Sequence, residues 1–282
     1  MATPSHSPEP AASDARRRRT RDRLVESALL VLGRRSADAS IIDELTALAG
    51  VSRGTFYNYF RTNDELLAAV AEEAGNALMR SVHPVTREVA DPAARVALGV
   101  RLVLTVAGAH PEFARFVARV GPAALGAGSL AAEIVPFDLA EGVAAGRFRI
   151  DDPKLAFDLV VGPVLAAFDT LQHRPLGRAY VDALAGAVLR ALGVPGATAT
   201  RLATRPLPPL QLPETSLIVR TEARARRLGP SEPHPGSATR RAPTRNSPMD
   251  TGSHPPAADP SRRRMLVATG VAAAAPIAAA QD

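Results

Sequence analysis

The chain has 282 residues, a net charge of +6 and no cysteine, and 46% of its residues are hydrophobic although only 4% are aromatic. This length allows about two domains of ~100 to 200 residues, and the absence of cysteine excludes disulfide frameworks, cysteine-ligated zinc, iron–sulfur clusters and thiol nucleophiles. The apolar residues are mostly Ala and Leu, which favours helices over strands, and no stretch of the first 200 residues is apolar for the ~20 residues of a membrane span.

The body of the chain reads as a succession of helices. Residues 1–15 are small, polar and Pro-containing, which predicts a disordered leader. From Arg16 to Leu192 apolar residues recur at helical spacing and no period-2 run appears, so the predicted fold class is all-α. A first helix is expected at about 21–32, with Gly33 as its stop.

The next helices are marked by capping residues. Ser40 opens a helix that ends at Gly50, and Ser52 caps a short helix that runs to Phe60. Thr62 begins a helix that continues to about Met79. Only two residues separate the first two of these helices, so residues 41–60 are predicted to form a helix-turn-helix within a domain at 16–80.

The short helix after Ser52 has one apolar and one polar face. Phe56 and Phe60 lie four residues apart and should pack inward. The outward rows hold the predicted DNA-facing residues, which are Arg53, Gly54, Thr55, Tyr57, Asn58 and Tyr59. Arginine can grip guanine O6 and N7, Thr and Tyr hydroxyls reach phosphates, and the missing side chain at Gly54 lets the backbone approach a duplex. Ser40 and Ile41 are expected near the DNA backbone.

Basic residues are concentrated in the same segment. Residues 16–61 carry a net charge of +5, whereas residues 91–193 are neutral. A charge run is often only a solvated face, but beside a helix-turn-helix we interpret the arginines at 16–19 as an arm that touches phosphates or the minor groove.

Residues 81–196 are predicted to be a second helical domain. Its helices are expected at about 92–108, 111–120, 129–145, 152–172 and 178–192. Candidates to line a pocket between them, or simply to fill a core, are His110, Phe113, Phe116, Arg119, Phe137, Phe168 and His173. Residues 197–282 are rich in Pro, Ser, Thr and Arg and are predicted to be a disordered tail.

The sequence offers no catalytic constellation. Asp151 and Asp152 stand immediately before Pro153 and are interpreted as a turn and a helix cap rather than as an acid/base pair. The six His have no paired metal-ligand spacing, and we expect no enzyme and no cofactor.

The segment 48–67, LAGVSRGTFYNYFRTNDELL, resembles the DNA-binding domain of the TetR (tetracycline repressor) family of bacterial transcription regulators. The chain differs from the family's usual pattern at Asn63, where Lys is common, and at Thr46, where Ala is common. The resemblance implies a cytoplasmic, homodimeric repressor that binds a palindromic operator in double-stranded DNA and is released by an unknown small-molecule inducer. It also implies that the helices at 152–172 and 178–192 form a four-helix dimer interface.

Two further readings remain open. The chain could instead be a ligand-independent DNA-binding architectural or adaptor protein, and a helical enzyme ranks below both.

The segment from Ser261, SRRRMLVATGVAAAAPIAAAQD, resembles a twin-arginine export signal. Its position near the end of the chain is unusual for such a signal, so we expect no export; Met249 onwards would be the start of a neighbouring protein joined in frame, or Ala-rich disorder.

Overall fold

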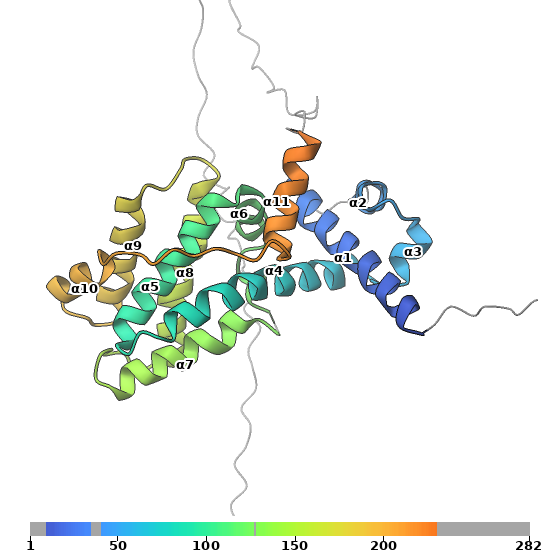
Figure 1. Cartoon of the computed structure of the whole chain (residues 1–282). Helices are drawn as coiled ribbons and strands as arrows, with labels where there is room; N and C mark the ends of the chain where they lie inside the picture. The colour runs from blue at the N-terminus through green and yellow to red at the C-terminus, as the bar shows by residue number, and fades with distance from the viewer. Residues whose placement is uncertain (1–9, 35–40, 127, 230–282) are drawn as a thin grey trace, which may run out of the picture. The chain divides into compact units, whose positions relative to one another are not determined.

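A computed structural model of the chain describes residues 10–34, 41–126 and 128–229. Every regular element in these ranges is a helix, which confirms the all-α prediction (Figure 1). The helices are α1 Pro10–Arg34, α2 Ile41–Ala49, α3 Arg53–Tyr57, α4 Asn63–Thr86, α5 Pro92–Ala109, α6 Pro111–Val120, the 3-10 helix η1 Gly121–Leu125, α7 Leu130–Ala144, α8 Pro153–Leu171, α9 Arg178–Ala191, α10 Gly196–Ala203 and α11 Leu217–Leu228.

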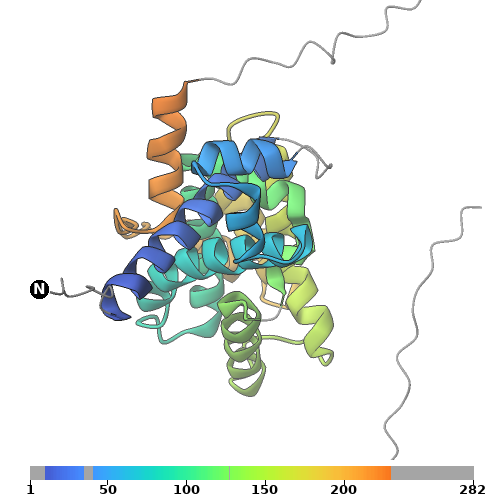
Figure 2. The ribbon, with the colours of Figure 1, turned by 90° about the vertical axis from the view of Figure 1, so that its right-hand side faces the viewer.

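The first three helices and the start of α4 form a small head. α1 packs on both α2 and α4, and α3 follows α2 at the outer end of the head (Figures 1 and 2). Leu45 of α2 and Phe56 of α3 are fully buried, and Phe60 is 3% exposed. The inward packing predicted for the two phenylalanines is therefore confirmed.

The larger part of the fold is a helical bundle around α5. This helix packs against α4, α7, α8, α9 and α10. By length and composition α5 could cross a membrane, but 61% of its apolar window is buried inside the fold. Burial of this kind is typical of the core helix of a globular domain.

A buried arginine ties the bundle to the chain that follows it. Arg101 of α5 is 1% exposed, and its Nε donates to Asp182 of α9 at 2.7 Å. Its Nη1 donates to the carbonyl of Arg205 at 2.8 Å, beyond α10. A buried charge needs such partners, so residues past α10 are part of the packed structure.

Three predicted boundaries in the first half of the chain are wrong. The short helix after Ser52 was expected to run to Phe60, but α3 ends at Tyr57. The first helix was expected from residue 21, with a disordered leader to residue 15, but α1 begins at Pro10. Pro is favoured in the first turn of a helix, and Ala and Arg, which dominate the next residues, are strong helix formers. α4 was expected to end near Met79, yet it continues through Pro84 to Thr86. Val82 is 1% exposed in this extension, and burial of this kind offsets the ~3 kcal/mol that an internal Pro costs a helix.

The predicted tail also begins too early. All of α10 except its first residue, and the whole of α11, lie within residues 197–229, where disorder was expected. Leu202 of α10 and Leu217 and Ile218 of α11 are each at most 3% exposed. The rest of the predicted tail, including the segment from Ser261, lies outside the described residues.

Candidate nucleic-acid interface and ligand cavity

The turn between α2 and α3 is set by one glycine and one serine. Gly50 has φ of +62°, which L-residues with a side chain adopt reluctantly. The N–H of Val51 then bonds back to the carbonyl of Thr46 at 3.0 Å, closing α2 in the manner of a Schellman motif. Ser52 caps α3 by accepting from the N–H of Thr55 at 3.1 Å, as predicted. These bonds fix the angle at which α3 leaves α2.

The face of α3 that points away from α2 is polar and open. Arg53, Gly54, Tyr57 and Asn58 are exposed, and Tyr57 keeps 53% of its surface accessible. An added Cβ at Gly54 would meet only the Ser52 hydroxyl, at 3.8 Å, so its outer side is free of protein. Two of the predicted residues are less accessible, because Thr55 and Tyr59 are half-buried.

Arg53 is oriented by a carboxylate on the neighbouring helix. Its Nε and Nη2 both donate to Asp43 of α2. This contact is solvent-exposed on both sides, with 60% of Arg53 and 59% of Asp43 accessible. The hydrogen bond from Arg53 lowers the pKa of Asp43, so the carboxylate stays ionised. The pair uses the Nε edge of the guanidinium, and no residue in the described part of the chain bonds to its Nη1 end.

The two residues expected near the DNA backbone at the start of α2 differ in outcome. Ile41 is 1% exposed and belongs to the core, so its side chain cannot reach a duplex. Only its main chain, at the amino end of α2, could serve the predicted role. Ser40 lies outside the described residues.

A hollow lined by arginines runs between α1 and α3. It has a volume of about 890 Å³ and none of its described lining residues is acidic. Its lining includes Arg16, Arg17, Arg19 and Arg23 from α1, together with Thr55, Asn58 and Tyr59. Arg17 stacks over the ring of Tyr59 at 5.9 Å, and Arg23 donates to the carbonyl of Gly50 at 3.2 Å. The predicted arm is thus helical, and part of it faces α3.

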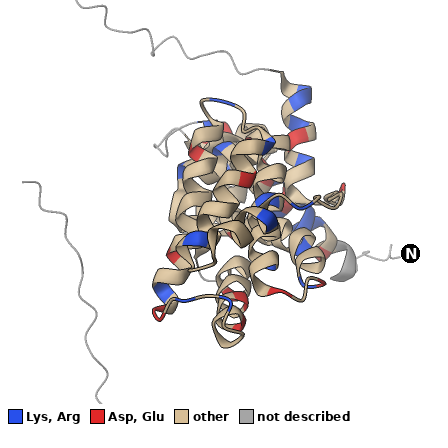
Figure 3. Ribbon diagram, turned by 90° about the vertical axis from the view of Figure 1, so that its left-hand side faces the viewer, with Lys and Arg blue, Asp and Glu red and all other residues tan. Residues whose placement is uncertain are grey.

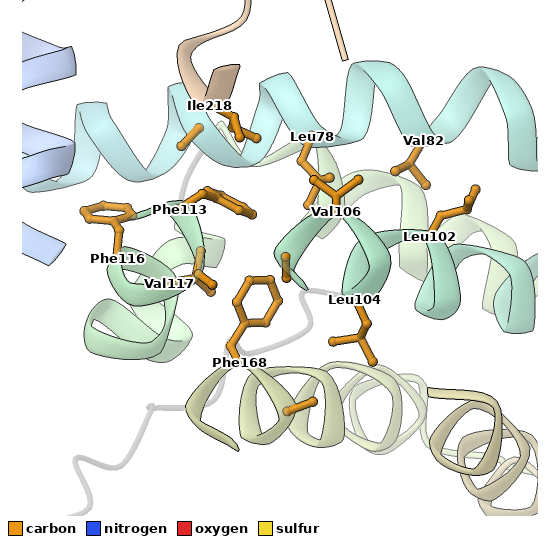
Figure 4. Packing of buried hydrophobic residues seen from close by; sticks show 14 of the residues in the cluster. Leu78, Val82, Leu102, Leu104, Val106, Phe113, Phe116, Val117, Phe168 and Ile218 are labelled. Atoms are coloured by element: carbon orange, nitrogen blue, oxygen red, sulfur yellow. The ribbon is translucent and has the colours of Figure 1, made fainter. Parts of the chain in front are cut away.

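A second cavity lies inside the bundle, walled by α4, α5, α6, α7 and α8. It has a volume of about 150 Å³ and its lining is mainly aliphatic, with Phe113 of α6 and Phe168 of α8. The two phenyl rings meet edge to face at 5.8 Å (Figure 4). The sequence offered both as pocket or core candidates, and the structure places them in both roles.

Polar groups border this apolar cavity on two sides. Arg95 donates to Asp138 at 2.7 Å, and both side chains are 11% exposed. Thr86 and Ser129 also line the cavity. The amide of Asn76 holds the neighbouring backbone by donating to the carbonyl of Gly128 and accepting from the N–H of Leu130, both at 2.8 Å. None of these four bordering polar residues was singled out from sequence, because their placement depends on how helices pack.

The other pocket candidates lie elsewhere. Phe116 is buried in the core and Phe137 is 62% exposed. Arg119 and His173 line an open cleft between α1, α6, α8 and α11. His110 ends α5, and burial, aided by the charge of Arg226, lowers its pKa. No group of three or more His, Asp or Glu able to hold a metal ion occurs in the described part of the chain.

Two protein-family models match the chain, one in the head and one in the bundle. The model described as "Bacterial regulatory proteins, tetR family" matches residues 24–70, and the model described as "Tetracyclin repressor-like, C-terminal domain" matches residues 91–205. A search of curated proteins found no match.

Solved structures give the same answer. RolR, whose crystal structure was solved in complex with its ligand resorcinol, is 32% identical in sequence to this chain. The match covers 70% of this chain and 100% of RolR, with a TM-score of 0.58. RolR without ligand is also 32% identical, covers 67% and 99% of the two chains and has a TM-score of 0.56. A TetR family regulator from Marinobacter aquaeolei VT8, at 13% identity, covers 64% of this chain and 98% of its own and has a TM-score of 0.54, which supports the fold alone. The chain therefore belongs to the TetR family of bacterial transcription regulators, with its DNA-binding domain at the N-terminus.

Proposed function

We propose that the protein is a homodimeric, cytoplasmic repressor that binds a palindromic operator and releases it when a small single-ring compound enters the bundle cavity. The observation that carries this proposal is the combination in one chain of an open polar α3 face with a mainly apolar cavity of about 150 Å³ between the bundle helices. The polar α3 face can contact a DNA duplex, and the apolar cavity can bind a small ligand.

For operator recognition we assign base reading to Arg53 and close approach to Gly54. Tyr57, the last residue of α3, and Asn58, its C-cap, are exposed and can reach phosphates or base edges. Thr55 and Tyr59, which border the arginine-lined hollow, are assigned to phosphate contacts together with Arg16 and Arg19.

For the dimer we assign the outer faces of α8 and α9. Leu155, Gly162 and Ala166 of α8 are exposed, and so are Ala183 and Ala187 of α9. Small and apolar residues on two neighbouring helices allow a close approach of the same face from a second copy, which is how a four-helix interface forms.

The size and lining of the cavity define the ligand class. A cavity of about 150 Å³ with apolar walls is large enough for one benzene ring. Hydroxyl groups on such a ring could bond to Thr86 or Ser129, or to the Arg95–Asp138 pair. RolR, which is 32% identical to this chain, was crystallised in complex with its ligand resorcinol, a dihydroxybenzene. We therefore propose a hydroxylated monocyclic aromatic compound, and resorcinol is the first probe.

A pair of glycine variants tests the cavity. Gly99 lines it, and a Cβ there would meet only a methyl of Thr86 at 3.8 Å, so Gly99→Leu should fill the space without straining the backbone. Gly108→Leu lies on the same helix with nothing within 4 Å and is the matched control. Resorcinol should raise the melting temperature of the wild type and of Gly108→Leu but not of Gly99→Leu.

Operator binding is tested separately by selecting duplexes from a random pool with the full chain. A sharp palindrome that resorcinol releases supports the repressor. Diffuse coverage of duplex DNA that no ligand affects would favour the ligand-independent architectural or adaptor protein instead.

A further inference from the structure

α11 lies beyond the segment that the family's C-terminal model covers. That model ends at residue 205, and α11 spans Leu217–Leu228. The helix packs against α1, α4 and α6, so it contacts both the head and the bundle (Figure 1). Leu217 and Ile218 are buried at its amino end, and Ile218 joins the cluster that contains Phe113 and Leu78 (Figure 4).

One side chain of α11 completes the amino end of α6. His110, the N-cap of α6, provides no side-chain hydrogen bond. Instead, the Oε2 of Glu222 accepts from the N–H of Glu112 at 3.2 Å. A carboxylate at this position also interacts favourably with the helix dipole. α6 then contributes Phe113 and Val117 to the cavity wall, so Glu222 contacts a helix that lines the cavity.

Two arginines of α11, on either side of Glu222 in the sequence, contact the head. Arg224 lies 3.3 Å from Glu26 of α1 and also donates to the carbonyl of Leu48, near the end of α2. Arg220 adds a second contact to Glu26, at 3.6 Å. Leu48 lies two residues before Gly50, where the turn between α2 and α3 begins. The basic residues of α11, with one acidic residue among them, are visible in Figure 3.

We propose that α11 is a coupling element, in which Glu222 and Arg224 link the cavity wall at α6 to the base of the recognition helix. A ligand that displaces the amino end of α6 would move α11 and, through Arg224, the end of α2. This role rests on the proposed function and adds to the covalent connection between head and bundle along α4. Glu222 and Arg224 are positioning residues, since neither faces the cavity or the α3 surface.

The coupling requires that α11 contacts both parts through bonds that are costly to break. Hydrogen bonds and ion pairs are short-ranged and directional, and a shift of α6 that lengthens the Glu222 bond strands a carboxylate that is only 7% exposed. Leaving a buried polar group without a hydrogen-bond partner costs free energy. A shift of α6 is therefore expected to move α11 with it rather than to break this bond.

The test uses full-length variants, the duplex selected by the wild type, and resorcinol as the probe. The variants are Arg224→Ala and Glu222→Ala, and the control is Arg227→Ala, which removes the same charge from an exposed position on the same helix. Operator affinity is measured with and without resorcinol, well below the melting temperature of each protein.

We expect wild type and Arg227→Ala to lose operator affinity on ligand addition by ~5- to 150-fold, the usual range of allosteric coupling. In Arg224→Ala and Glu222→Ala this ratio should fall at least about threefold, and ligand-free operator affinity should fall as well, because the head is less preorganised. Arg224→Lys can keep only one of the two contacts and should be intermediate.

Variants that melt at lower temperature but keep both the ratio and the ligand-free operator affinity would show that α11 only stabilises the fold, and would overturn the proposal. If resorcinol has no effect on the wild type, ligand-free affinity decides: unchanged binding in Arg224→Ala overturns the coupling role. Failure of the proposed function would appear in the wild type itself, whereas failure of the coupling appears only in the variants.

Discussion

The two ends of the Arg53 guanidinium differ in their contacts. The Nε edge of its guanidinium is held by Asp43, while the Nη1 end points away from that contact. An arginine held in this way loses less side-chain entropy when it binds a base than one that is free to rotate. Asp43 is thus a candidate support for base reading, although it never needs to touch DNA.

Removal of Arg53 should affect selectivity more than general affinity. Arg53→Ala is expected to cost ~1 to 3 kcal/mol of discrimination between the selected duplex and one with a changed guanine, because a bidentate contact is lost. Competition binding with the two duplexes measures it. Unchanged discrimination would exclude Arg53 from base reading.

Asp43→Asn should change general DNA affinity and sequence discrimination in opposite directions. It removes a negative charge beside the phosphates and frees Arg53, so affinity for random duplex should rise while discrimination falls. A simultaneous gain in discrimination would contradict the support role. The same competition assay, repeated at two salt concentrations, separates the phosphate term from the base term.

Glu112 and Glu222 should show opposite pH dependence. Burial raises the pKa of Glu112, but the hydrogen bonds from Arg34 and Arg115 outweigh it, and the pKa falls below the ordinary 4.5. Its stabilising effect is therefore present above pH 4.5 and lost as the pH falls through the lowered pKa. Burial is the main reason why the pKa of Glu222 lies above 4.5, despite the bond from the Glu112 N–H and the nearby Arg226 and Arg115.

Stability curves of two amide variants test this contrast. The stability difference between wild type and Glu112→Gln should be constant at neutral pH and shrink as the pH falls below about 4.5. Relative to Glu222→Gln, wild type should instead lose stability as the pH rises from 4.5 through the raised pKa of Glu222. Chemical unfolding at several pH values measures both. Parallel curves for the two variants would contradict the assigned environments.

Residue patterns predicted the site where the signal was local. The Ser52 cap and the inward turn of Phe56 follow from spacing within one short segment, and the structure bears out both. The Asp43–Arg53 pair joins residues ten positions apart on two helices, and the burial of Ile41 depends on how α2 packs against α1. Neither can be read from one helix alone.

At the scale of elements, composition misled where it was averaged over long stretches. The high Pro content of residues 197–282 as a whole predicts disorder, and this average hides the amphipathic run LIVRTEARARRL that forms α11. Its apolar face needs α1, α4 and α6 as partners, and partners in space are not visible in a single sequence. The bundle helices α5 to α9 were predicted within a residue or two because Pro, Gly and Asp mark their ends.

Two truncations separate the packed and remaining parts of the tail. A chain ending after Gly229 keeps all described helices and should keep its melting temperature. A chain ending after Arg205 loses α11, with Leu217 and Ile218, and the full burial of each such side chain contributes ~1.5 to 3 kcal/mol. We expect its melting temperature to fall by several degrees in calorimetry. Equal melting temperatures for the two chains would show that α11 adds nothing to stability.

At the scale of the whole molecule, the cavity and the α3 face are joined by shared helices. α4 is the next helix after α3, packs on α1 and lines the cavity with Leu78, Met79 and Val82. A ligand that prefers one arrangement of these helices can change the separation of two heads in a dimer. That separation must match half-sites roughly 34 to 36 Å apart on the duplex.

Thermodynamic linkage makes this coupling testable from the ligand's side. If resorcinol weakens operator binding by some factor, the operator must weaken resorcinol binding by the same factor, because both describe one free-energy difference of ~1 to 3 kcal/mol. Calorimetric titration of resorcinol into the protein, alone and saturated with the selected duplex, measures it. A scrambled duplex of equal length is the control, and it should leave resorcinol affinity unchanged. A ligand that binds with equal affinity in every titration cannot shift the equilibrium, however tightly it binds. That result would exclude release by this compound and favour a DNA-binding role that is independent of the ligand.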